Sequence, residues 1–174
     1  SLRVTLDDGS GFDLTEAGTQ RKLAIYVVTA PEQVPGIAAL GPDPLSEGFD
    51  RASLDAIVAA AGRAQLKGVL RDQRVIAGIG NAYSDEILHA ARMSPFTPAA
   101  SLDEADRQLL FDSIKGALAD ALGRSSGLPP NKLKDDKRTA LRVHGRTGET
   151  CDVCGTTIAE VRSADSSLQH CPRC

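Results

Sequence analysis

The sequence predicts an α+β protein of several domains, in which short strands come first, helices follow and a cysteine-bearing hairpin comes last. Three observations predict this order. Residues 1–28 are predicted to be β, because apolar and polar side chains alternate on both sides of a turn signal and residues 22–28 form an apolar run. From Ser53 to Leu122 the apolar residues recur with the period of a helix. All four cysteines fall within residues 151–174, in two Cys-x-x-Cys pairs.

The composition is that of a globular protein, since 41 % of the 174 residues are hydrophobic and 25 % are charged. No apolar run reaches the roughly 18 residues that a transmembrane helix requires, and the first residues lack the pattern of a signal peptide. The net charge of −3 argues against a uniformly basic nucleic-acid binder, and the scarcity of aromatic residues argues against a broad base-stacking surface. Residues 61–150 nevertheless carry 14 basic against 11 acidic residues, which hints at a polyanionic partner.

Three strands are predicted at the start of the chain. Val4 lies before the hairpin turn signal Asp-Asp-Gly-Ser, and Phe12 lies after it. Residues 22–28 are predicted to form a third, buried strand. Three strands are a poor free-standing unit, so we interpret them as the end of a larger sheet. Residues 31–50 are rich in proline and glycine, and we interpret them as a linker.

Four helices are predicted after this linker. The first begins at Ser53 as its N-cap, a short second covers residues 65–72, and a third covers residues 81–91. The fourth opens with a capping box formed by Ser101 and Glu104. It continues to about residue 122 with an apolar stripe made of Leu102, Leu109, Leu110, Ile114, Leu118 and Leu122.

The turn Ala-Gly-Ile-Gly-Asn at residues 77–81 leads into the third helix. Glycines allow close approach of a ligand to the backbone, and a helix start offers free N–H groups and a positive dipole end to phosphate. Asn81 can cap the helix and offer its amide to a phosphate oxygen, while Arg63 and Lys67 could face the same anion. A helical corner that needs its glycines only for packing explains the motif equally well.

The cysteine spacing is that of a four-cysteine zinc site. Two residues between paired ligands let both sulfurs face one tetrahedral ion, and Gly155 supplies a permissive backbone after the first pair. Four protein ligands leave no position for a catalytic water, so we expect one structural Zn²⁺ per chain. Two disulfides are the alternative, although nothing in the sequence suggests secretion. The expected ligands are Cys151, Cys154, Cys171 and Cys174.

Three segments together resemble the formamidopyrimidine-DNA glycosylase / endonuclease VIII family. Residues 66–88 resemble its helix–two-turns–helix, residues 143–149 resemble the approach to its C-terminal zinc finger, and residues 14–18 resemble the end of its N-terminal β-sandwich. The resemblance covers nearly the whole chain. It implies four parts in chain order. Remnant strands of the sandwich cover residues 1–30, and a linker covers residues 31–50. A helix–two-turns–helix domain covers residues 51–130, and a basic loop with a zinc finger covers residues 131–174.

The resemblance implies a base-excision-repair enzyme that flips an oxidised base out of duplex DNA, cleaves its glycosidic bond and nicks the abasic strand. It also implies a monomer that acts on damaged double-stranded DNA in the bacterial cytoplasm, at the nucleoid and away from membranes. The DNA-binding residues that it implies are Arg63, Lys67, Gly80 and Asn81, and it implies the four cysteines as zinc ligands.

Two departures from the family pattern concern catalysis. The nucleophile of the family is an N-terminal proline amine beside a glutamate, whereas this chain begins with Ser1-Leu-Arg. We therefore expect no catalytic residue in this chain. The family also carries an arginine on the finger hairpin where Ser166 stands in this sequence, which weakens the expected contact with the phosphate at the lesion.

Two other function classes fit the same residues. The first is a non-catalytic module that binds lesions or abasic sites. The second is an RNA-binding helix–two-turns–helix protein, against which the four-cysteine finger argues.

Several further residues are interpreted mainly as structural. Asp85 and Glu86 are expected to be solvated helix charges, and Tyr83 is expected to pack in the core. The three histidines are His89, interpreted as structural, His144, in a turn near the finger, and His170, a ligand only if a cysteine is not used. Lys132, Lys134, Lys137 and Arg138 are predicted to lie in a basic loop, either near DNA or simply solvated.

Overall fold

The computed structural model describes residues 1–16, 22–162 and 167–174, and it divides into two compact units. The first unit covers Ser1–Ala38 and the second covers Ala39–Cys174. Among the described residues, no helix combines the length and apolar character needed to cross a membrane.

The first unit begins with the predicted hairpin. Strands β1 (Leu2–Thr5) and β2 (Gly11–Leu14) pair antiparallel, with Val4 opposite Phe12. The turn is closed by Asp8, whose carboxylate accepts a hydrogen bond of 2.9 Å from the next-but-one backbone N–H. Two short helical turns end the unit, η1 at Pro31–Gln33 and α1 at Pro35–Ala38.

The predicted third strand is wrong. Residues 22–28 form no strand, and their side chains are exposed, including Ile25, Tyr26 and Val27. A strand requires a hydrogen-bonded neighbour, and no strand in the described part of the chain pairs with this segment. A short apolar run is therefore an insufficient signal for a strand here.

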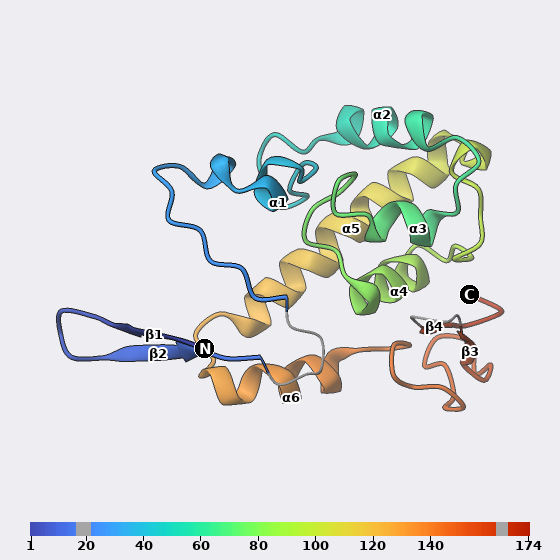
Figure 1. The fold of residues 1–174 in the computed structure, drawn as a ribbon. Coiled ribbons are helices and arrows are strands. Elements are labelled where there is room, and N and C mark those ends of the chain that lie inside the picture. Colours follow the sequence, from blue (N-terminus) through green and yellow to red (C-terminus); the bar gives the residue numbers. More distant parts are fainter. Residues whose placement is uncertain (17–21, 163–166) are drawn as a thin grey trace. The chain divides into compact units, whose positions relative to one another are not determined.

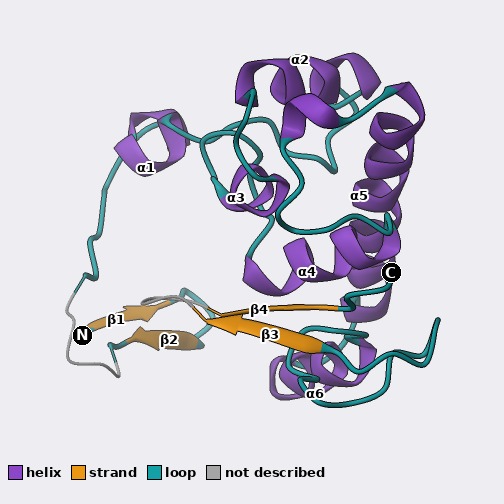
Figure 2. Cartoon of the chain, turned by 90° about the vertical axis from the view of Figure 1, so that its right-hand side faces the viewer, coloured by secondary structure: helices purple, strands orange, loops and turns teal. Residues whose placement is uncertain are grey.

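The second unit is a helical domain followed by a small hairpin (Figure 1). Helices α2 and α4 pack against the long helix α5, and α3 packs against α4 (Figure 2). The C-terminal strand β4 also contacts α4, which places the hairpin beside the helical domain. The helices are α2 (Arg51–Ala61), α3 (Leu66–Arg71), α4 (Asn81–Ala90), η2 (Ala99–Ser101), α5 (Glu104–Ser125) and α6 (Pro130–Ala140).

One apolar core joins helices α2 to α5. Its members include Leu54 of α2, Leu70 of α3, Ile87 of α4 and Ile114 of α5, each no more than 1 % exposed. The predicted stripe of the long helix is confirmed for Leu102, Leu110, Ile114 and Leu118, whereas Leu109 and Leu122 are exposed.

The N-caps of α2 and α5 differ from the predicted ones. Asp50, rather than Ser53, is the N-cap of α2, and its carboxylate accepts from the Ser53 N–H at 2.8 Å. Asp103 caps α5 in a capping box with Asp106, so the predicted box of Ser101 and Glu104 is wrong. Aspartate is as good an N-cap as serine, so a serine at the start of a helical pattern does not by itself fix the first residue of the helix.

Residues 131–140 are helical, so the predicted basic loop is also wrong. Pro130 is the first residue of α6, a position where the fixed φ of proline suits a helix. The chain then reaches the cysteine hairpin, where β3 (Ala159–Arg162) pairs antiparallel with β4 (Ser167–His170). A second, smaller core lies under this hairpin and includes Val143, Cys151, Ile158 and Cys171.

Candidate nucleic-acid interface and metal centre

The turn before α4 is held by the side chain of Gln73. Its Nε2 donates to the carbonyl oxygen of Ile79 at 2.7 Å, and its Oε1 accepts from the N–H of Gly78 at 2.8 Å. Gly78 has φ of 84°, which glycine adopts without strain. The predicted tight turn is confirmed, and Gln73 is a residue that sequence reasoning missed. The turn leaves Gly80 exposed as the N-cap of α4.

Asn81 lies at the junction between the start of α4 and the cysteine hairpin. Its Nδ2 donates to the carbonyl oxygen of Ser167 on β4 at 2.8 Å. Its Oδ1 is buried and has no hydrogen-bond partner within the described ranges. The prediction that Asn81 caps the helix is wrong, because Gly80 occupies that position without a side-chain cap.

Of the two cations predicted to face this turn, Arg63 is exposed and Lys67 is enclosed. Arg63 lies in the turn after α2, and none of the ion pairs described for this chain involves it. Lys67 lies on α3, 5 % exposed, with its Nζ 2.5 Å from the carboxylate of Asp85. Burial lowers the pKa of Lys67, and the hydrogen bond and ion pair with Asp85 oppose that shift.

Asp85 connects three parts of the second unit. One carboxylate oxygen pairs with Lys67 of α3, and the other lies 2.7 Å from Nδ1 of His144. That second oxygen also accepts from the backbone N–H of Gln169 on β4 at 3.2 Å. A buried carboxylate is stable only with such partners, so Asp85 fixes α3 and the hairpin to α4.

Glu86 holds the chain segment that leads into the hairpin. Its carboxylate accepts backbone N–H groups of Arg142, Val143 and His144 at 2.8, 2.9 and 2.8 Å. The prediction that Asp85 and Glu86 are solvated is therefore wrong. Adjacent acids on a short helix usually mark a solvated face, but α4 is enclosed by α3, α5 and β4 and has little free face left.

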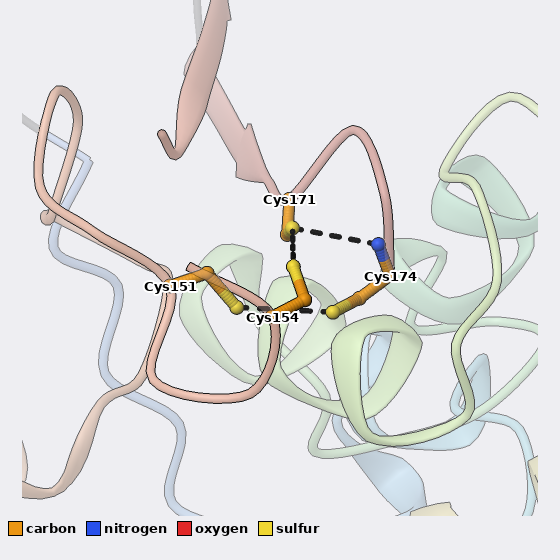
Figure 3. Close-up of side chains that lie close together, drawn as sticks. All are labelled: Cys151, Cys154, Cys171 and Cys174. Carbon is orange, nitrogen blue, oxygen red and sulfur yellow. Dashed lines mark hydrogen bonds between the residues drawn. The ribbon is translucent and has the colours of Figure 1, made fainter. Parts of the chain in front are cut away.

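The four cysteines converge on one point (Figure 3). The Sγ atoms of Cys151 and Cys174 lie 3.8 Å apart, and those of Cys154 and Cys171 lie 3.3 Å apart. All four sulfurs lie within 4.8 Å of one another, and none is in a disulfide. A tetrahedral Zn²⁺ with bonds of about 2.3 Å needs sulfurs about 3.8 Å apart, so the donor set fits zinc.

Two histidines adjoin this cluster without replacing a cysteine. The Nε2 of His89 lies 3.4 Å from the Sγ of Cys151, and burial lowers the pKa of His89. His170 packs edge-on against the ring of Phe96, and its buried Nδ1 has no partner in the described part of the chain. His89 thus supports a ligand sulfur from the helical domain, as its structural interpretation expected.

Helix α6 carries exposed basic side chains, and one of them lies over the ring of an α4 residue. Lys132, Lys134 and Arg138 are exposed, and the Nζ of Lys137 lies 5.2 Å from the ring centroid of Tyr83. Tyr83 also packs against the helical core, as the sequence predicted.

Family comparisons match both parts of this arrangement. Residues 40–128 match the formamidopyrimidine-DNA glycosylase H2TH domain, and residues 148–174 match the zinc finger found in FPG and IleRS. A formamidopyrimidine-DNA glycosylase-like protein of Mycobacterium tuberculosis is 49 % identical over 136 residues, which are 78 % of this chain and 84 % of that protein. The chain belongs to the formamidopyrimidine-DNA glycosylase family.

Solved structures of formamidopyrimidine-DNA glycosylases share the fold. The MutM (Fpg) protein of Thermus thermophilus is 34 % identical with a TM-score of 0.70, over 80 % of this chain and 55 % of that one. The Lactococcus lactis Fpg, solved in a complex with DNA containing an abasic site, is 30 % identical with a TM-score of 0.70, over 83 % and 55 %. This chain therefore spans about half the length of these glycosylases.

Membership of the glycosylase family supports the metal assignment and leaves the DNA-contact residues as predictions. The four-cysteine finger holds a structural zinc ion. Ser166, at the position of the family's finger arginine, lies outside the described residues. The DNA-binding assignments of Arg63, Lys67, Gly80 and Asn81 stay predictions, although all four residues lie within the matched H2TH domain. The match to DNA glycosylases lends no support to the RNA-binding alternative.

Proposed function

We propose that this chain is the DNA-binding part of a base-excision-repair glycosylase and abasic-site lyase that acts on oxidised bases in duplex DNA. The observation that supports this most is the likeness of its helical domain and finger to the Lactococcus lactis Fpg in complex with abasic-site DNA. A protein that reacts with a base inside a duplex must evert that base. Contacts with the DNA backbone on both sides of the base keep the duplex in place during this step.

The proposed phosphate contacts centre on the start of α4. Gly80 is exposed there, and the first N–H groups of a helix carry partial positive charge toward an anion. The amide of Asn81 adds a donor, and Arg63 adds an exposed cation from the preceding turn. Contacts of this kind fix register on the duplex without reading its sequence.

Helix α6 extends the proposed contact surface. Lys134 and Arg138 are one helical turn apart and exposed, so they lie on a common face. Lys137 packs over Tyr83, two residues after Asn81, which ties α6 to the start of α4. We propose that these cations add sequence-independent affinity for duplex DNA.

Base excision itself is proposed to require groups that residues 1–174 do not supply. The family chemistry uses a proline amine beside a glutamate as nucleophile, and residues 1–3 of this chain are serine, leucine and arginine. The chain is therefore proposed to bind abasic DNA as a monomer without forming a Schiff base.

Borohydride trapping tests this proposal. The zinc-loaded chain is incubated with a duplex oligonucleotide that contains one abasic site, and borohydride reduces any Schiff base to a stable adduct. Binding in an anisotropy titration without an adduct is the expected result. An adduct would contradict it and would indicate a lysine nucleophile such as Lys132. Absence of binding would contradict the DNA-binding proposal as a whole.

A second candidate is a non-catalytic module that recognises lesions or abasic sites. The matched region makes up 84 % of the Mycobacterium tuberculosis relative, so the two chains are of similar length. The two candidates differ in one result. A glycosylase forms the adduct when this chain is tested with all upstream residues of its parent, and a sensor does not.

A further inference from the structure

We propose that Lys67 positions the DNA-contacting start of α4 and is not itself a phosphate ligand. This inference rests on the proposed DNA-binding function. It assigns Lys67 an indirect role in DNA binding. Of the two cations, only Arg63 then contacts a DNA phosphate directly.

The ammonium group of Lys67 has no donor to spare. An ammonium has three N–H donors. The Nζ of Lys67 lies 3.2 Å from the carbonyl oxygen of Asn81, 3.0 Å from the hydroxyl of Ser84 and 2.5 Å from the carboxylate of Asp85. Three acceptors therefore use three donors, and a phosphate could bind only by displacing one of them.

The ion pair within this set is the hardest to displace. The side chains of Lys67 and Asp85 are 7 % and 1 % exposed, so their attraction is poorly screened by water and salt. Loss of either partner would leave an uncompensated charge in the interior. A DNA phosphate would have to compete with a fixed carboxylate that already neutralises the lysine.

The acceptors of Lys67 lie on the part of α4 that carries the proposed DNA contacts. Asn81 and Ser84 belong to its first turn, and the Ser84 hydroxyl also donates to the Asn81 carbonyl at 2.9 Å. Lys67 thus joins α3 to the residue whose side-chain amide is the proposed phosphate donor. The same Asp85 carboxylate holds Gln169 of β4, so Lys67 also supports the finger strand.

Salt dependence of DNA binding separates the two roles. The affinity of the zinc-loaded full chain for an abasic-site duplex is measured over a range of salt concentrations. Each lost phosphate contact lowers the slope of log affinity against log salt by about one. We expect Arg63→Ala to lower the slope by about one. We expect Lys67→Met to weaken binding roughly tenfold or more with the slope unchanged.

The side-chain amide of Asn81 provides a second readout that involves no DNA. Its ¹⁵N–¹H resonances are assigned by their absence from Asn81→Ala. In Lys67→Met these resonances should shift while the zinc content and the rest of the helical-domain spectrum persist. In Arg63→Ala they should stay in place. Unmoved Asn81 resonances in Lys67→Met would contradict the positioning role.

A double variant covers the case in which Lys67→Met does not fold. Lys67→Met/Asp85→Asn leaves no unpaired charge in the interior. Weaker binding with an unchanged slope supports the proposal in either background, and a slope lowered by about one overturns it in favour of a direct phosphate contact. Unchanged affinity also overturns it. If the unmodified chain binds no DNA, the proposed function fails, and the Asn81 resonances still decide whether Lys67 positions that residue.

Discussion

The carboxylate of Glu86 accepts a hydrogen bond of 2.9 Å from the backbone N–H of Val143, 57 residues further along the chain. The same carboxylate binds the N–H groups on either side of Val143. One side chain of the helical domain thus satisfies three consecutive donors of the segment that leads into the zinc finger. The orientation of the finger relative to α4 depends on this contact as well as on Asp85.

Replacement of Glu86 should therefore loosen the finger. In Glu86→Gln an amide –NH₂ group faces backbone donors, so at least one hydrogen bond to a charged acceptor is lost. Such bonds contribute about 1.5–3 kcal/mol, and we expect a loss of unfolding free energy in that range, measured by chemical denaturation. Glu47→Gln, at an exposed position, is the matched control and should change stability by less than about 0.5 kcal/mol. Equal stability of the two variants would contradict this prediction.

Zinc removal should unfold the finger and spare the helical domain. The two cores are separate clusters, one built from α2–α5 and one from Val143, Ile158 and the cysteines. The binding energy of a structural zinc is largely folding energy, so only the second core depends on it. Metal analysis should find about one zinc per chain. After chelation, the helical circular dichroism signal should largely remain while finger resonances collapse. Two disulfides by mass, with no metal, would contradict the zinc assignment.

Much of the fold follows from short-range patterns in the sequence. The spacing of Leu110, Ile114 and Leu118 correctly predicts the buried face of α5, and the cysteine spacing predicts the metal site. These signals work because helix periodicity and a tight knuckle are local properties of the chain.

The errors come from partners distant in sequence. Asp85 and Glu86 have the local pattern of surface charges, but α3, α5 and β4 enclose the helix that carries them. No local pattern in the sequence predicts that enclosure. Residues 22–28 look like a strand but have no strand partner among the residues described. Residues 131–140 are predicted to be a loop because of their many charges. Pro130 is a helix-start signal, and it correctly indicates the first residue of α6.

Asn81→Ala should weaken DNA binding to a similar extent for duplexes of different sequence. A hydrogen bond to a charged phosphate contributes about 1.5–3 kcal/mol, so we expect a loss of at least roughly tenfold in affinity. The Nδ2 of Asn81 also binds the Ser167 carbonyl oxygen, so a stability loss of about 1 kcal/mol should accompany it. Glu47→Ala, at an exposed position outside the proposed contact surface, is the control for both measurements. A change of sequence preference at constant mean affinity would rule out a phosphate contact.

Neutralising the exposed face of α6 should reduce affinity without harming the fold. Lys134 and Arg138 are exposed, and no ion pair of the described residues engages either side chain, so their replacement by glutamine removes little from stability. If both contact phosphates, Lys134→Gln/Arg138→Gln lowers the salt slope of duplex binding by about two, measured by anisotropy. The exchange Lys134→Arg/Arg138→Lys keeps both charges and should keep the slope. If the salt slopes of the two double variants were equal, the basic side chains of α6 would lie in solvent without contacting phosphates. The proposed contact surface would then end at the start of α4.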